Sequence, residues 1–217
     1  MNLLFDFGGV LVDLDKSRCI AAFDKIGFDV RPFIGTYAQA GILSKLERGE
    51  VSIEAFCAEL RQMSGNAAVS DEAIVYAWQQ YLLDVPEERL ELLLKAHRHY
   101  PLYVLSNTNE VHWAMAQDGY FRYKGLHVED FFDKVFLSCR LGTEKPSPKI
   151  FQAVVDGIGC SPSEIVFFDD SDVNCQAARQ CGLQSLLAPA GSVWLQYFDE
   201  DGRLNGKTEA DLVYPNT

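Results

Sequence analysis

The sequence lacks the features that would mark it as a zinc-binding, disulfide-rich or membrane protein. Its six cysteines are scattered, with no Cys-x-x-Cys pair and no cysteine–histidine cluster of zinc spacing, which favours reduced, partly buried thiols. No apolar run approaches membrane-spanning length. The apolar start has no basic region before it and is interrupted by Asp6, so it does not resemble a signal peptide. We therefore expect a cytoplasmic protein with no membrane partner.

Positive charge is also scarce. The chain has 19 Lys and Arg against 31 Asp and Glu, a net charge of −12, and this argues against a nucleic-acid partner because phosphate backbones require a basic surface. With 217 residues, of which 48% are hydrophobic, the chain is long enough for one ordinary domain with a small insert. The oligomeric state is left open by the sequence.

Short apolar segments alternate with helical ones over most of the chain. The expected strands cover residues 2–6, 102–105, 134–137, 165–168 and 184–187. The expected helices between the later strands cover 110–116, 148–158 and 173–181. Such alternation is typical of βαβ units, so the sequence predicts an α/β fold with a doubly wound, Rossmann-like parallel sheet.

A different pattern separates the first strand from the rest. Residues 15–84 have helical spacing over 19–26, 53–60 and 74–81, with Ser52 as one N-cap. We expect an all-helical cap there and a core formed by 1–14 plus 85–189. The tail, 190–217, is expected to dock partly on the core through its aromatic residues, with the polar stretch 199–217 partly loose. Asp13 and Asp15 are interpreted as caps of the first insert helix.

Polar residues follow three of the predicted strands. They are Asp6, then Ser106 and Asn107, then Asp169 and Asp170. The carboxyl ends of parallel strands meet at one edge of a sheet, where α/β proteins bind ligands. Lys145 lies on a connection between two strands. These residue types would together suit phosphoryl transfer. One carboxylate would act as the nucleophile, the clustered carboxylates would hold a divalent cation, and the hydroxyl and ammonium groups would bind the phosphoryl oxygens.

Each of these residues also has a purely structural interpretation. Asp6 at a strand end is compatible with capping the next turn, and Ser106 and Asn107 with capping the following helix. Asp169 and Asp170 are compatible with an N-cap cluster, and Lys145 with a solvated surface lysine. Their occurrence together, in this order on alternating strand ends, favours the chemical interpretation.

These segments resemble the four motifs of the haloacid dehalogenase superfamily. The matching residues are Asp6-Phe-Gly-Gly-Val-Leu, Leu105-Ser-Asn-Thr-Asn, Glu144-Lys-Pro, and Phe167-Phe-Asp-Asp with Asn174. The helical insert is similar to the cap that one subgroup places after its first strand. The segments from Glu47 to Ser52 and from Leu105 to Asn109 are most similar to the branch that contains an α-D-glucose-1-phosphate phosphatase.

The resemblance implies a role for each matching residue. Asp6 would be the nucleophile, and its carboxylate would hold Mg²⁺ with the Gly8 backbone carbonyl and Asp170, with Asp169 as a further ligand or a neighbour. Ser106, the Asn107 backbone N–H and Lys145 would bind phosphate, and Lys145 would be catalytic. The implied function is an Mg²⁺-dependent phosphatase of a small phosphorylated metabolite, such as a sugar 1-phosphate, that works through an aspartyl-phosphate.

One position departs from the family pattern. Most phosphatases of the superfamily have a second Asp where this chain has Gly8, and that Asp protonates the leaving oxygen. Asp13 is a possible substitute. Because position 8 has no acidic side chain, we expect the rate of Asp6 phosphorylation to depend steeply on how readily the leaving group departs as an anion. General acid catalysis would otherwise contribute about 10²–10⁴-fold. The glycine at position 8 leaves two alternatives open. One is a dehalogenase or phosphonate hydrolase activity, and the other is a non-catalytic phosphate-binding role.

Overall fold

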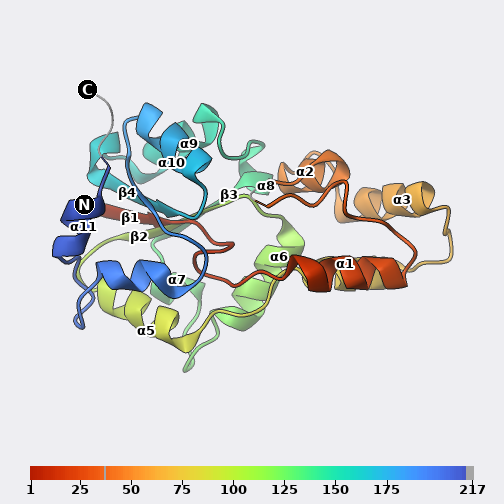
Figure 1. Cartoon of the computed structure of the whole chain (residues 1–217), viewed down its shortest axis with the longest axis horizontal. Coiled ribbons are helices and arrows are strands. Elements are labelled where there is room, and N and C mark those ends of the chain that lie inside the picture. The colour runs from red at the N-terminus through yellow and green to blue at the C-terminus, as the bar shows by residue number, and fades with distance from the viewer. Residues whose placement is uncertain (37, 214–217) are drawn as a thin grey trace.

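A five-stranded, all-parallel sheet forms the centre of the molecule (Figure 1). We describe the protein from a computed structural model, in residues 1–36 and 38–213. The strand order is β3-β2-β1-β4-β5. The strands are β1 (Asn2–Phe5), β2 (Leu102–Ser106), β3 (Lys134–Leu137), β4 (Ile165–Asp169) and β5 (Gln184–Leu187). The predicted fold class is therefore confirmed, and the first strand along the chain lies in the middle of the sheet.

Helices connect and cover the strands. The helices between β1 and β2 are α1 (Lys16–Lys25), α2 (Gly41–Glu47), α3 (Ile53–Ser64), α4 (Asp71–Gln79) and α5 (Glu87–Ala96). Those that follow are α6 (Glu110–Met115), the π-helix η1 (Ala116–Tyr120), α7 (Val128–Phe131), α8 (Ser138–Leu141), α9 (Pro148–Ile158), the 3₁₀ helix η2 (Pro162–Glu164), α10 (Asp172–Gln180), the 3₁₀ helix η3 (Ser192–Tyr197) and α11 (Gly206–Asp211).

Helices cover both faces of the sheet, which is why the central strands β1, β2 and β4 are largely apolar and buried. α9 and α10 lie on one side of the sheet and α5 on the other (Figure 1). Successive residues of β1 point to opposite faces, so that Leu4 packs in the cluster under α9 and α10. Leu3 and Phe5 pack in the second cluster, with residues of α5 and η3. Asp6, the next residue, therefore follows a fully buried strand at the carboxyl edge.

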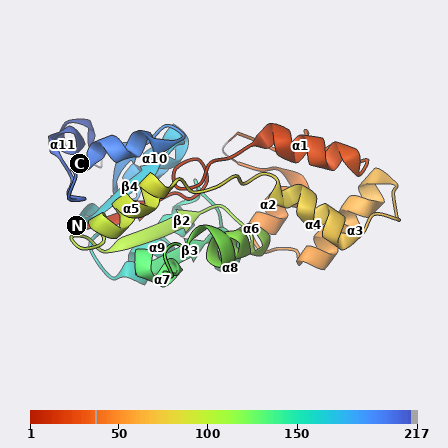
Figure 2. The same cartoon turned by 90° about the horizontal axis from the view of Figure 1, so that it is seen from below.

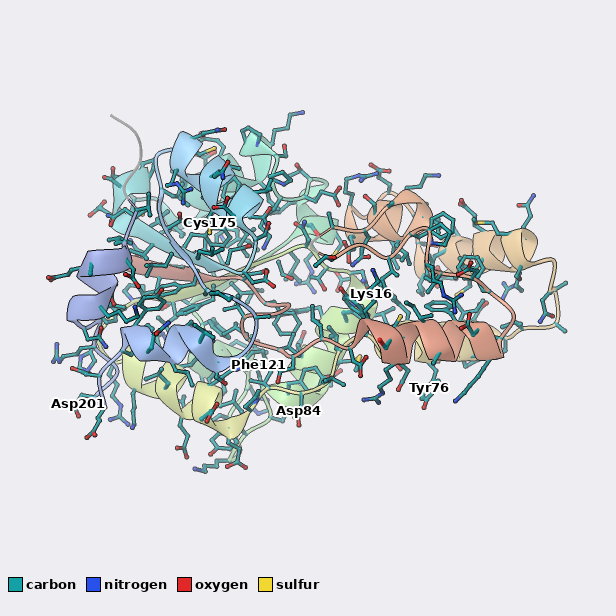
Figure 3. The ribbon with its side chains drawn as sticks, viewed as in Figure 1. Lys16, Tyr76, Asp84, Phe121, Cys175 and Asp201 are labelled. Atoms are coloured by element: carbon teal, nitrogen blue, oxygen red, sulfur yellow. The ribbon has the colours of Figure 1, made fainter. Side chains whose placement is uncertain are left out.

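Helices α1 to α4 project from that edge as a separate lobe (Figures 1 and 2). Tyr76 lies on this lobe and Asp201 at the opposite end of the molecule (Figure 3). The hydroxyl of Ser52 accepts a hydrogen bond from the Ala55 N–H at 3.2 Å, as expected of an N-cap. The sequence analysis did not anticipate α2. The apolar cluster of the sheet continues into the lobe, and the division into a core and a cap at residues 15 and 84 stays a prediction.

The interpretation of Asp13 as a helix cap is wrong. Asp15 alone caps α1, by accepting a hydrogen bond from the Arg18 N–H at 2.9 Å. The Asp13 carboxylate instead accepts from Arg89 Nη2 at 2.7 Å. The Arg89 side chain is 2% exposed and also donates to the Leu11 carbonyl at 2.9 Å. A buried guanidinium requires such partners, so Asp13 compensates the charge of Arg89.

The tail is more ordered than the sequence indicates. Trp194 is fully buried, and its indole N–H donates to the Val10 carbonyl at 3.0 Å. Residues 206–211 form α11, and Val213 bridges to Ser185 beside β5, which contradicts the expected looseness up to that point. Residues 214–217 lie outside the described part of the chain. Among the residues described, no helix combines the length and apolar character needed to cross a bilayer.

Candidate active site

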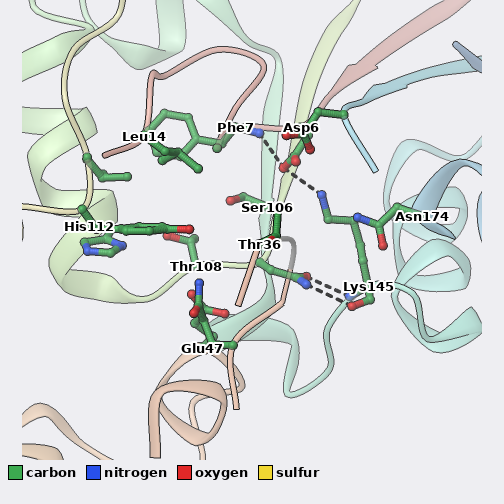
Figure 4. Close-up of a pocket in the computed structure, with 16 residues that line it drawn as sticks. Asp6, Phe7, Leu14, Thr36, Glu47, Ser106, Thr108, His112, Lys145 and Asn174 are labelled. Carbon is green, nitrogen blue, oxygen red and sulfur yellow. Dashed lines mark hydrogen bonds and ion pairs between the residues drawn. The ribbon is translucent and has the colours of Figure 1, made fainter. Parts of the chain in front are cut away.

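A pocket lies where the carboxyl edge of the sheet faces the helical lobe (Figure 4). The sheet side contributes Asp6, Phe7, Gly8, Ser106, Asn107, Thr108, His112, Lys145, Asp170 and Asn174. The residues between β1 and α5 contribute Leu14, Thr36, Gln39, Glu47, Tyr81 and Leu82. The candidate residues after β1, after β2 and after β4 thus reach one cavity.

Asp6 is held at the end of β1 by backbone hydrogen bonds. Its N–H donates to the Phe168 carbonyl at 2.8 Å, which continues the pairing between β1 and β4. Its carboxylate accepts from the Phe7 N–H at 2.7 Å. The residue is 7% exposed, so this carboxylate is held in place and largely removed from bulk solvent.

Lys145 is buried between two carboxylates and is not the solvated lysine of the structural interpretation. Its Nζ lies 2.7 Å from Asp6 Oδ1 and 2.7 Å from Asp169 Oδ2, and it donates to the Leu105 carbonyl at 3.3 Å. The side chain is 2% exposed. Two charge-assisted contacts of this length orient the ammonium group firmly.

The Asn107 side chain fixes the backbone that carries this lysine. Its Nδ2 donates to the Lys145 carbonyl at 3.0 Å, and its Oδ1 accepts from the Lys145 N–H at 2.8 Å. The sequence analysis assigned Asn107 only a backbone N–H for phosphate. The side-chain contact joins the loop after β2 to the loop before α9, and thereby positions Lys145 beside Asp6.

Asp169 and Asp170 have different surroundings. Asp169 is completely buried and accepts hydrogen bonds from the Ser171 N–H at 2.8 Å and from Asn174 Nδ2 at 3.1 Å, in addition to Lys145. Asp170 lies against the turn after β1, where a Cβ added at Gly9 would be 2.3 Å from Asp170 Oδ2. Gly9 has a φ of +84°, so both its conformation and this close approach require glycine.

The carboxylates of Asp6, Asp169 and Asp170 carry an excess of negative charge. One oxygen of each lies within 4.8 Å of the others. Burial, together with the charges of Asp169 and Asp170, raises the pKa of Asp6 despite the opposing effect of Lys145. Burial and the charge of Asp169 raise the pKa of Asp170 to about 6. Burial alone would lower the pKa of Lys145, but Asp169 and Asp6 hold it above its usual value.

One ammonium group therefore faces three carboxylates, and a divalent cation would balance the remainder. Hard cations such as Mg²⁺ prefer oxygen ligands and are held by a few carboxylates together with substrate phosphate. The donor set fits such an ion. Asp169, already saturated by three protein donors, is better suited to a supporting position than to direct ligation.

The wall formed by residues between β1 and α5 was not assigned from the sequence. Glu47 at the end of α2 and Tyr81 after α4 both line the pocket. On the sheet side His112 was also missed; its Nε2 lies 3.0 Å from the Trp78 carbonyl, and its ring stacks on Trp78 with a centroid separation of 4.5 Å. Burial lowers the pKa of His112 to about 4, so the ring is neutral near pH 7. Apolar periodicity in the lobe gives no signal for residues that face the sheet.

The family model that matches this chain is that of the haloacid dehalogenase-like hydrolases, over residues 1–182. This chain belongs to the haloacid dehalogenase-like hydrolase family. The match covers the four motifs and the residues between them, so the family assignment made from the sequence is confirmed. This family is a family of hydrolases, and residues from each of the four motifs, among them Asp6, Ser106, Lys145 and Asp170, line the pocket of this haloacid dehalogenase-like hydrolase.

Relatives of known structure or name support the assignment. The hydrolase is 33% identical over 196 residues to a D-ribitol-5-phosphate phosphatase of Bacteroides thetaiotaomicron, covering 90% of this chain and 95% of the relative. A crystal structure of a HAD family enzyme from the same organism, in complex with magnesium and inorganic phosphate, superposes with a TM-score of 0.84 at 40% identity, covering 91% and 98% of the two chains. A HAD-like family hydrolase from Porphyromonas gingivalis superposes with a TM-score of 0.82 at 30% identity, covering 90% and 94%.

Proposed function

We propose that this hydrolase is an Mg²⁺-dependent phosphatase of a small phosphorylated carbohydrate. The observation that carries the proposal is the arrangement of Lys145 between Asp6 and Asp169, with Asp170 in the same cluster. A carboxylate nucleophile, an ammonium group and a carboxylate pair for a cation are the parts that phosphoryl transfer requires. The magnesium and phosphate in the related crystal structure support the same proposal.

In the first step, an Asp6 carboxylate oxygen attacks phosphorus, and the bond to the leaving oxygen breaks. Lys145, the Ser106 hydroxyl and the Asn107 backbone N–H hold the phosphoryl oxygens as negative charge develops on them. In the second step, water attacks the aspartyl-phosphate and releases phosphate. The burial of Asp6 and Lys145 strengthens each of these contacts, because water does not compete with them.

Asp6, Asp170 and the Gly8 backbone carbonyl are the groups that would hold Mg²⁺. When bound, the ion neutralises carboxylate charge and polarises the phosphoryl group. Asp6 would then be ionised at neutral pH, since the cation offsets the burial and the neighbouring charges that raise its pKa.

The substrate class follows from the wall that faces the sheet. Thr36, Gln39 and Tyr81 line the cavity, and hydroxyl and amide side chains of this kind suit the hydroxyls of a sugar or polyol. The relative named as a D-ribitol-5-phosphate phosphatase favours a polyol or sugar phosphate with a primary ester. A sugar 1-phosphate, which the sequence resemblance suggested, is the second candidate.

Dehalogenase activity is the weaker alternative. An L-2-haloacid dehalogenase superposes with a TM-score of 0.58 at 19% identity, a similarity that supports the common fold alone. Displacement of halide requires no cation, and without a cation Asp169 and Asp170 would repel both the Asp6 carboxylate and an anionic haloacid. The acidic cluster therefore favours the phosphatase.

A phosphate-release assay tests the proposal. The substrates are ribitol 5-phosphate, glucose 6-phosphate, glucose 1-phosphate and p-nitrophenyl phosphate, each with Mg²⁺ or with EDTA, and a 2-haloacid serves as a halide-release control. We expect phosphate release that requires Mg²⁺, is lost in Asp6→Asn and is retained in Asp156→Asn, a matched change at an exposed carboxylate on α9. Halide release that persists in EDTA, or no release of phosphate from any substrate, would contradict the proposal.

A further inference from the structure

Glu47 places a further carboxyl group in the pocket, on the side opposite Asp6. It is the last residue of α2 and is 4% exposed. It lines the same cavity as Asp6 and Lys145, and Figure 4 shows it across the pocket from Asp6. The mechanism described above makes no use of this residue.

The protein core holds the end of α2 in place. The Ser138 hydroxyl donates to the Glu47 carbonyl at 2.5 Å. Arg48 Nη1 lies 2.9 Å from Glu144 Oε1, on the loop that carries Lys145. A Cβ added at Gly49 would lie 2.1 Å from the Cys139 carbonyl oxygen, so glycine is required for this close approach. Contacts at three successive residues thus fix the end of α2 against the core, and Glu47 is thereby held in the pocket wall opposite Asp6.

The Glu47 carboxyl group has no hydrogen-bond partner among the residues that the structure describes. In the described ranges, 1–36 and 38–213, no hydrogen bond to its oxygens is found, and neither oxygen is among the sealed, unpartnered polar atoms. A buried carboxyl that is neither paired nor sealed faces the cavity. Such a group is costly to bury unless a ligand completes its hydrogen bonding.

The surroundings of this carboxyl favour its protonated form. Burial raises the pKa of Glu47 well above its usual value, the carboxylates of Glu144 and then Asp6 add to the effect, and Lys145 and Arg48 oppose it. The titratable and charged groups around it come from the lobe and the core: Arg48, Tyr81, Asp6, Glu144 and Lys145. The group can therefore carry a proton at neutral pH.

The reaction needs a proton donor at this place. Position 8 has no side chain, and a primary alkoxide is a poor leaving group without one. In an in-line displacement the leaving oxygen lies on the side of phosphorus opposite the attacking oxygen. With Asp6 on the sheet side, that oxygen faces the wall that contains Glu47.

We propose that Glu47 is the general acid of this enzyme and replaces the side chain that is absent at Gly8. The inference rests on the proposed phosphatase function. As Asp6 Oδ bonds to phosphorus and the ester P–O bond breaks, the electron pair of that bond passes to the leaving oxygen, which takes the Glu47 proton. Water then attacks the phosphorus of the aspartyl-phosphate, the bond between phosphorus and Asp6 Oδ breaks, and the Glu47 carboxylate takes a proton from that water. One cycle thus releases the alcohol and phosphate and restores the Asp6 carboxylate and the protonated Glu47, and Asp13, paired with Arg89, takes no part.

A leaving-group series separates this role from a structural one. We would measure kcat/KM of wild type, Glu47→Gln and Glu59→Gln for ribitol 5-phosphate, glucose 6-phosphate and a set of substituted phenyl phosphates. Glu59 lies on α3 outside the pocket, its side chain is 39% exposed, and it serves as the matched control. Glu47→Gln should lower kcat/KM for the alkyl phosphates by about 10²–10⁴-fold. It should change kcat/KM for p-nitrophenyl phosphate by less than about tenfold, because that leaving group departs as an anion.

The pH profile gives the second readout. The wild-type kcat/KM for alkyl phosphates should fall as the pH rises through the pKa of the acid, and this limb should vanish in Glu47→Gln. An equal loss for alkyl and phenyl phosphates, or a change in KM alone, would show that Glu47 only orients the substrate and would overturn the proposal. If wild type releases no phosphate even from p-nitrophenyl phosphate, the proposed function fails instead, so the two failures are distinguishable.

Discussion

Replacing Lys145 by methionine should reduce both stability and turnover. Methionine approximates the shape of the lysine stem but leaves Asp6 and Asp169 without the ammonium group that lies 2.7 Å from each. Removal of one partner from a buried ion pair costs about 3–5 kcal/mol. At about 2–4 °C per kcal/mol for a chain of this size, Tm should fall by about 6–20 °C in the absence of metal.

The loss of turnover has a separate magnitude. A charge-assisted hydrogen bond contributes about 1.5–3 kcal/mol, which corresponds to a decrease in kcat/KM of about 10- to 150-fold if Lys145 contacts the phosphoryl group. Lys149→Met is the matched control, since Lys149 is exposed on the adjoining α9. Thermal unfolding in EDTA and phosphate release with Mg²⁺ measure the two effects.

A second variant tests the electrostatic cause. Asp169→Asn added to Lys145→Met removes one of the two uncompensated carboxylates, so the double variant should unfold at a higher temperature than Lys145→Met alone. If Lys145→Met instead unfolds within about 2 °C of Lys149→Met, an interval worth about 1 kcal/mol or less, the buried charges are not coupled as the distances indicate. Unchanged turnover would refute the contact with phosphate.

Three further predictions concern the nucleophile, the cation and the histidine. Asp6→Asn should abolish phosphate release and retain the wild-type circular dichroism spectrum, because the amide fits the site but is a poor nucleophile; turnover within about tenfold of wild type would exclude the assignment. Mg²⁺ affinity, measured by calorimetry, should be largely lost in Asp170→Ala. In wild type the affinity should fall below pH 6, because Asp170, with a pKa of about 6, must release its proton to bind the ion. An affinity that does not change between pH 7 and pH 5 would argue against Asp170 as a ligand. The pKa of His112 is about 4 in the folded protein and about 6.5 in the unfolded chain. Between these pH values the unfolded chain binds a proton that the folded protein does not. The free energy of unfolding should therefore fall by up to about 3 kcal/mol as the pH drops from 6.5 to 4. His112→Gln should lack this component in urea unfolding, and an identical pH dependence in variant and wild type would refute it.

Local sequence determined the framework of this enzyme. An apolar strand buried on both faces needs only its own residues to be recognised, and polar residues directly after such strands must lie at the carboxyl edge of a parallel sheet. The positions of Asp6, Ser106 and Asp169 at one edge therefore followed from the sequence, and the strand boundaries differ from the predicted ones by one residue at most. The same locality explains why Ser52 was found as an N-cap.

Tertiary structure alone decided which side chains compensate one another. Lys145 contacts Asp6, 139 positions away in the sequence, because two loops lie side by side in the fold. The Asn107 side chain fixes the loop that carries Lys145, although its partner there is 38 positions away. The prediction that Asp13 caps a helix was wrong for the same reason. Arg89, 76 positions away, is buried beside Asp13, and its guanidinium group requires the carboxylate of Asp13. A local pattern contains no information about such distant partners.

The helical lobe shows this limit most clearly. Its periodicity predicts which residues pack inside it, but residues that face the sheet depend on how the lobe is attached. Gly49 and Ser138 set that attachment through contacts with backbone atoms, and they bring Glu47 to the pocket as a buried acid. Sequence therefore determined the chemistry of the sheet edge, whereas only the folded chain decided what faces it, because burial and charge compensation are set by neighbours in space.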